Sequence, residues 1–199
     1  MNNKKTFLII IVLFALLIVG AYALYSSLSQ GVSPQQMIVH DTSQSADEPE
    51  TQNAAQEEAH APHVPDFIVY DRNGSEVHFS QFIGKPTVLN FWASWCSSCV
   101  HEMPAFQEKY AELGDSVNFV MVNKTDGTRD TVEKASAFID QNGYEFTVLY
   151  DTASNAVDIF GIQGLPTTFF IDAGGHIIAQ ATGELDSATL QQGIDMITG

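Results

Sequence analysis

Two cysteines, Cys96 and Cys99, are the only thiols of the chain, and two serines separate them. They follow an apolar stretch, Thr87–Trp92, which predicts a buried strand, and they begin a stretch compatible with a helix. Unpaired N–H groups and the helix dipole at such a position favour a thiolate, the attacking species in disulfide exchange. The pattern therefore predicts thiol–disulfide exchange, with Cys96 attacking and Cys99, one helical turn further, resolving the mixed disulfide.

Two other interpretations of the cysteine pair stay open at this point: a static structural disulfide, and half of a zinc site shared between chains. A bridge that closes so short a loop adds little stability, which argues against a static role. The position between a strand and a helix favours redox chemistry.

Three neighbours of the pair are candidate site residues. Glu102 follows Cys99 by three residues, so its carboxylate could accept or deliver the proton of the resolving thiol; the alternative is an ordinary solvated acid. Trp95 could shield the site and offer an apolar docking surface. Leu165-Pro166 precedes a predicted strand, and Pro166 is either an ordinary loop residue or part of a cis peptide bond.

Composition limits the class of protein. The 199 residues include 24 acidic and 8 basic side chains, for a formal net charge of −16, which argues against a nucleic-acid partner. Two cysteines are too few for a disulfide-stapled scaffold or a four-cysteine zinc site. His60 and His63 lack the further ligands that a metal site needs, so neither a metal nor a cofactor is predicted.

The N-terminal region predicts export. Phe7–Tyr25 is an uncharged apolar run of 19 residues after Lys4 and Lys5, long enough for a membrane helix with the N-terminus in the cytoplasm. The alternative is a cleaved signal peptide, because Ala21-Tyr22-Ala23 fits a cleavage site. We expect an anchor or signal over residues 1–25 and a flexible acidic linker over 26–61.

Residues 62–199 predict one domain with alternating strands and helices. The expected strands cover 67–70, 76–79, 87–92, 117–122, 146–150, 167–171 and 176–181, and the expected helices cover 96–113, 131–141, 154–160 and 187–197. Turn residues join the first two strands and the last two strands into hairpins. The order predicts an α/β sandwich with a mixed sheet.

Residues 90–104, NFWASWCSSCVHEMP, and residues 161–172, GIQGLPTTFFID, resemble two motifs of the TlpA/ResA-like membrane-anchored thiol–disulfide oxidoreductases of the thioredoxin superfamily. The resemblance implies a thioredoxin-like three-layer sandwich with an N-terminal hairpin and a central αβ insertion at 124–150. It also implies an active-site role for Glu102 and a cis Pro166 facing the disulfide, with Leu165 contacting a bound partner through its backbone.

The same resemblance implies an extracytoplasmic, membrane-tethered reductase that takes electrons from a membrane carrier of the CcdA/DsbD kind. Its substrates would be oxidised exported proteins, such as apocytochrome c or a methionine sulfoxide reductase. Asn90 occupies the position of thioredoxin's buried aspartate, and the dipeptide between the cysteines lacks the usual proline, so the redox direction stays open. The alternatives are a disulfide-forming oxidase, a thiol peroxidase, and a tethered binding domain without enzymatic activity.

Overall fold

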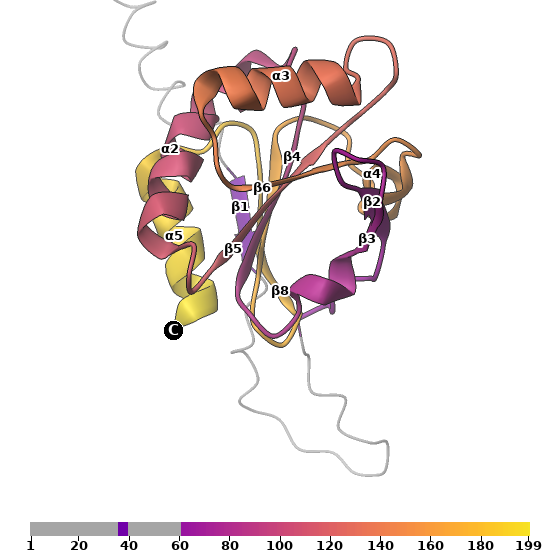
Figure 1. Cartoon of the computed structure of the whole chain (residues 1–199). Helices are drawn as coiled ribbons and strands as arrows, with labels where there is room; N and C mark the ends of the chain where they lie inside the picture. The colour runs from indigo at the N-terminus through magenta and orange to yellow at the C-terminus, as the bar shows by residue number, and fades with distance from the viewer. Residues whose placement is uncertain (1–35, 40–60) are drawn as a thin grey trace, which may run out of the picture. The chain divides into compact units, whose positions relative to one another are not determined.

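A computed structural model describes residues 36–39 and 61–199 of the chain. The described elements form one sheet with helices on both faces (Figure 1). They are β1 Gln36–Val39, β2 Ile68–Tyr70, β3 Glu76–His78, the 3-10 helix η1 Phe79–Phe82, β4 Thr87–Trp92, α2 Ser97–Leu113, β5 Asn118–Asn123, α3 Val132–Asn142, β6 Thr147–Tyr150, α4 Asn155–Ile159, β7 Thr167–Ile171, β8 Ile177–Thr182 and α5 Ser187–Thr198. The order agrees with the predicted alternation, and the ends of the predicted elements differ from the observed ones by at most one residue.

The sheet is mixed, with strand order β1-β8-β7-β4-β5-β6-β2-β3. Strands β4, β5 and β6 are parallel, whereas β7 pairs antiparallel with β4 and β2 pairs antiparallel with β6. Every residue of β4 is buried, as expected for a central strand covered on both faces. In this register, Asn90 of β4 lies opposite Thr168 of β7.

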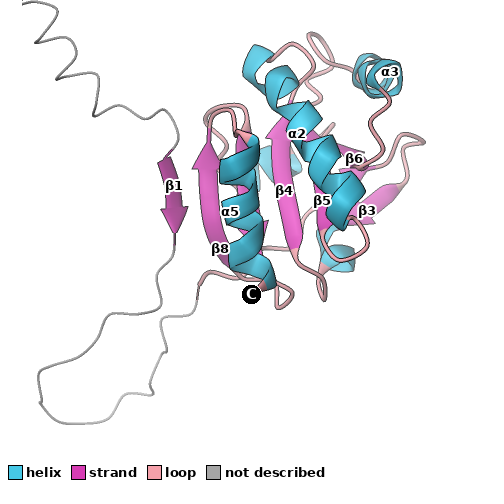
Figure 2. Ribbon diagram, turned by 90° about the vertical axis from the view of Figure 1, so that its left-hand side faces the viewer, coloured by secondary structure: helices cyan, strands magenta, loops and turns pink. Residues whose placement is uncertain are grey.

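Two hydrophobic clusters lie on opposite faces of the sheet, because alternate side chains of β4 point in opposite directions. Val88 and Trp92 belong to the cluster under α2 and α5, and Leu89 and Phe91 belong to the cluster on the other face. Figure 2 shows α2 and α5 side by side over the sheet, and Figure 1 places α4 on the opposite side. The predicted thioredoxin-like α/β sandwich is confirmed, and α3 and β6 occupy the predicted insertion.

The structure differs from the sequence prediction within the expected linker over residues 26–61. Residues Gln36–Val39 form β1, which pairs antiparallel with β8 from Gln36 opposite Thr182 to Val39 opposite Ala179. The apolar and β-branched side chains of Met37, Ile38 and Val39 favour a strand. The expectation of a wholly flexible linker is therefore wrong for these four residues.

The predicted membrane span, Phe7–Tyr25, and His60 lie outside the described residues. Over residues 36–39 and 61–199, no helix has the length and apolar character needed to cross a membrane.

Gly193 sets how closely α5 approaches β7, so we expect Gly193→Ala to lower the free energy of unfolding by about 1–3 kcal/mol. A Cβ atom at this position would overlap the ring of Phe170. The gain in helix propensity, about 1 kcal/mol, offsets only part of this cost. Urea unfolding of the described domain measures the change, with exposed Gln192→Ala as the control. An unchanged midpoint for Gly193→Ala would show that Phe170 can move aside.

Candidate active site

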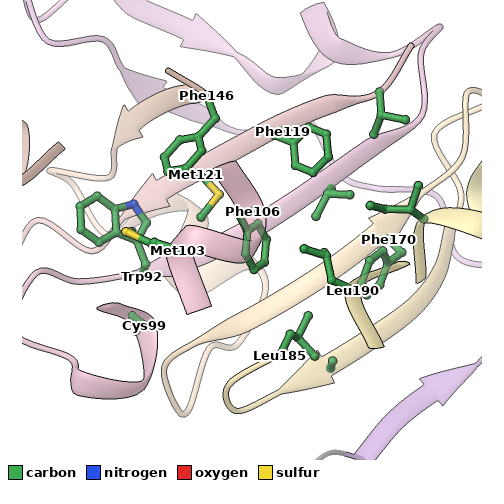
Figure 3. Packing of buried hydrophobic residues seen from close by; sticks show 14 of the residues in the cluster. Trp92, Cys99, Met103, Phe106, Phe119, Met121, Phe146, Phe170, Leu185 and Leu190 are labelled. Carbon is green, nitrogen blue, oxygen red and sulfur yellow. The ribbon is translucent and has the colours of Figure 1, made fainter. Parts of the chain in front are cut away.

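The cysteine pair lies where β4 leads into α2. Cys96 is the N-cap residue of α2, and its Sγ accepts a hydrogen bond from the backbone N–H of Cys99 at 3.3 Å. The two residues form a disulfide with their Cα atoms 5.3 Å apart. Cys96 is 8% exposed whereas Cys99 is fully buried in the cluster that contains Trp92 and Met103 (Figure 3). An external thiol or disulfide can therefore reach Cys96 more easily than Cys99, and the attacking and resolving roles stay predictions.

Glu102 lies one turn after Cys99 on the same buried face of α2 and is only 2% exposed. Its Oε1 accepts a hydrogen bond from Asn90 Nδ2 at 2.8 Å, and its Oε2 accepts one from the backbone N–H of Leu185 at 2.9 Å. Burial raises the pKa of Glu102 to about 8, although the two hydrogen bonds oppose the rise; the charge of Glu184 adds to it. The alternative of a solvated surface acid is wrong, whereas a role in proton transfer stays a prediction.

Asn90 joins Glu102 to strand β7. Its Nδ2 also donates to Thr168 Oγ1 at 3.0 Å, while its Oδ1 is buried without a hydrogen-bond partner among the described residues. A half-turn of the amide would present the oxygen to Glu102 instead. Asn90 can therefore donate to an ionised Glu102 or accept from a protonated one, and it carries no charge of its own in either case.

A groove of about 330 Å³ lies beside Cys96. Trp95, Lys124 and Leu165 line it together with residues 162–164. The peptide bond between Leu165 and Pro166 is cis, as the resemblance implies. The structure thus brings Trp95, Cys96 and Leu165 to one groove, while Pro166 is buried and is not among the groove-lining residues.

Sequence reasoning missed two residues that contact the active-site loop, the segment 93–96 between β4 and α2. Asp130 accepts hydrogen bonds from the backbone and the hydroxyl of Ser94, and the guanidinium of Arg129 lies over the ring of Trp95. The order of the strands could have indicated this proximity, because β4 and β5 are adjacent parallel strands whose carboxyl ends meet at one edge of the sheet. The polar segment that follows β5 therefore had to lie near the cysteines.

The arrangement suits two-electron exchange at sulfur. In the reaction that the predicted roles imply, the Cys96 thiolate of the reduced protein would attack a substrate disulfide, forming a mixed disulfide and releasing one substrate thiolate. Cys99 would then lose its proton and attack Cys96 Sγ, releasing the second substrate thiolate and forming the Cys96–Cys99 bond. Within residues 36–39 and 61–199, no group of His, Cys, Asp or Glu side chains is arranged to hold a metal ion.

Comparisons with known proteins agree with this chemistry. The sequence model of the AhpC/TSA family matches residues 61–180. The thiol-disulfide oxidoreductase ResA of Bacillus anthracis is 31% identical over 135 residues, which cover 68% of this chain and 76% of that protein. ResA of Bacillus subtilis strain 168 is 29% identical over 135 residues, covering 67% and 73%.

Solved structures show the same fold. The crystal structure of StoA from Bacillus subtilis has a TM-score of 0.57 at 29% identity and covers 66% of this chain and 98% of that one. The exposed lipoprotein thioredoxin Etrx1 of Streptococcus pneumoniae strain TIGR4 has a TM-score of 0.56 at 26% identity, covering 64% and 96%.

Proposed function

The chain belongs to the ResA-like thiol–disulfide oxidoreductases of the AhpC/TSA family, and on that premise we propose that it works as a reductase of oxidised exported proteins. The predicted enzyme class, thiol–disulfide oxidoreductase, is confirmed by these relatives together with the Cys96–Cys99 pair. The direction of electron flow is the part that we propose.

The surroundings of the cysteines support the reducing direction. Strong disulfide-forming oxidants stabilise their reduced form through a thiolate of very low pKa. Here the single hydrogen bond to Cys96 Sγ from the described residues comes from one backbone N–H, and Cys99 is fully buried among apolar side chains. Burial without a nearby charge partner disfavours a thiolate at Cys99. The N-terminus of α2 favours a thiolate at Cys96, but a dithiol without further stabilisation of its thiolate gives up its electrons more readily than that of a strong oxidant.

The peroxidase alternative lacks its chemistry at the expected positions. Peroxidases of this superfamily resemble one another in a proline and a threonine or serine before the reactive cysteine, whereas Leu89 and Ala93 stand at those positions here. Both side chains are fully buried and apolar, so neither can donate a hydrogen bond to a peroxide. Rapid thiol-dependent consumption of peroxide would overturn this argument.

The reduction potential of the Cys96–Cys99 couple tests the proposed direction. We expect a value at or below about −250 mV, in the range of electron donors such as thioredoxin. Equilibration of residues 61–199 with defined ratios of oxidised and reduced dithiothreitol, followed by acid trapping, measures it. A value near −120 mV, typical of a disulfide-forming oxidant, would contradict the reductase and favour the oxidase (about 130 mV higher, or roughly 6 kcal/mol).

We further propose that a single membrane helix over Phe7–Tyr25 tethers the domain outside the cytoplasm, where a carrier of the CcdA/DsbD kind reduces it. The length of the apolar run and the preceding lysines support this topology. Apocytochrome c and a methionine sulfoxide reductase are the proposed substrates. Fractionation of cells tests the tether: the full-length chain should stay with membranes after an alkaline wash, whereas a soluble product that lacks the apolar run would indicate a cleaved signal.

A further inference from the structure

The loop between β5 and α3 contacts the active-site loop through a buried carboxylate. Asp130 is fully buried. Its Oδ2 accepts a hydrogen bond from the backbone N–H of Ser94 at 2.7 Å, and its Oδ1 accepts one from Ser94 Oγ at 2.7 Å. Asn123 Nδ2 adds a third donor at 2.9 Å. Because Ser94 lies two residues before Cys96, this carboxylate fixes the backbone that leads into the attacking cysteine.

A second contact follows immediately in the sequence. The guanidinium carbon of Arg129 lies 3.7 Å from the centroid of the Trp95 ring, which is a favourable cation–π position. Arg129 also forms an ion pair with Asp126, because its Nε donates to Asp126 Oδ2 at 3.2 Å. Asp126 Oδ1 in turn accepts hydrogen bonds from the backbone N–H groups of Thr128, Arg129 and Asp130. The ion pair with Asp126 therefore favours the conformation in which the guanidinium of Arg129, an exposed side chain, lies over the indole.

Trp95 connects these contacts to the reaction, because its side chain is 42% exposed and lines the groove beside Cys96. We propose that Asp130 and Arg129 are positioning residues that hold Ser94 and Trp95, so that the groove presents one fixed wall to the polypeptide of the protein whose disulfide is exchanged. The inference rests on the proposed function, and it adds two residues, Asp130 and Arg129, that would govern how a protein partner docks. It concerns protein partners, since a small disulfide can reach Cys96 without contacting the indole.

Arg129→Ala tests the proposal through two substrates. Insulin is the protein disulfide and hydroxyethyl disulfide is the small one, with turnover driven by dithiothreitol. We expect KM for insulin to rise about two- to fivefold, the effect of one exposed cation–π contact, with kcat and the turnover of hydroxyethyl disulfide unchanged. Arg129→Lys should recover part of the loss, because it keeps the charge but not the planar group. Arg72→Ala is the control, since Arg72 pairs with Asp140 on an exposed surface.

Fluorescence gives a readout that is independent of turnover. Trp92 is fully buried, so acrylamide should quench mainly Trp95, and Arg129→Ala should increase that quenching. Ser94→Ala, which removes one hydrogen bond to Asp130 and keeps the backbone one, should change insulin KM and quenching in the same direction.

Unchanged quenching and unchanged insulin KM in Arg129→Ala would overturn the proposal, as would an equal loss of turnover with both substrates. A wild-type protein that reduced neither substrate would refute the proposed function instead, and the quenching measurement would still decide whether Arg129 holds Trp95.

Discussion

Cys99→Ser is expected to convert a transient exchange complex into a stable mixed disulfide between Cys96 and its partner. Attack on an incoming disulfide needs only Cys96, which lines the groove, whereas release of the partner needs the buried Cys99. Well-placed intramolecular groups reach effective molarities of about 10⁵ M or more, so external thiols at millimolar concentrations should resolve the adduct several orders of magnitude more slowly. Acid trapping, non-reducing electrophoresis and mass spectrometry would identify the adducts.

Two matched variants make this result decisive. Cys96→Ser should form almost no adduct, because the remaining thiol is fully buried. Ser98→Ala, between the two cysteines, should turn over without accumulating one. Adducts on Cys96→Ser at the level of Cys99→Ser would reverse the assigned roles, and their absence from every variant would count against exchange with proteins.

Local sequence patterns predicted the elements that carry the thiols. The mostly apolar run Thr87–Trp92 has apolar side chains on both faces of the strand, as a central strand requires. Its prediction as a buried strand therefore had few alternatives. Helical spacing placed Cys99 and Glu102 on one face of α2, and the structure adds that both side chains are buried there. Both inferences depend on residues within one element, whose geometry follows from the backbone period.

The contacts between distant segments could not be predicted in the same way. The hydrogen bond from Leu185 to Glu102 joins residues 83 positions apart, and it explains why an acid can be buried there. The contact between Ser94 and Asp130 depends on how β4 and β5 pair. Strand β1 also depends on a distant edge, because a short apolar segment forms a strand only where β8 offers unpaired backbone groups.

Glu102→Gln is expected to slow reduction of the Cys96–Cys99 disulfide by about 10²-fold near pH 7, at the lower end of general acid catalysis. When a donor thiolate attacks Cys96, Cys99 leaves as a thiolate and must take up a proton. Glu102 lies one turn away on the same buried face, and its pKa of about 8 keeps most of it protonated at neutral pH. Glutamine fills a similar volume but has no proton to give at this pH.

The pH dependence distinguishes proton transfer from a packing role for Glu102. Because burial raises the pKa of this carboxyl, its acid form is present below about pH 8 and is lost above it. The wild-type rate with dithiothreitol, corrected for the thiolate fraction of the reagent, should therefore fall as the pH rises through about 8.

Glu102→Gln should give a lower and flat profile, and Glu108→Gln, which changes an exposed acid of the same helix, should reproduce the wild type. If the profile of Glu102→Gln kept the wild-type step, another group would have to supply the proton, and the buried carboxyl would serve only to join α2 to Asn90 and Leu185.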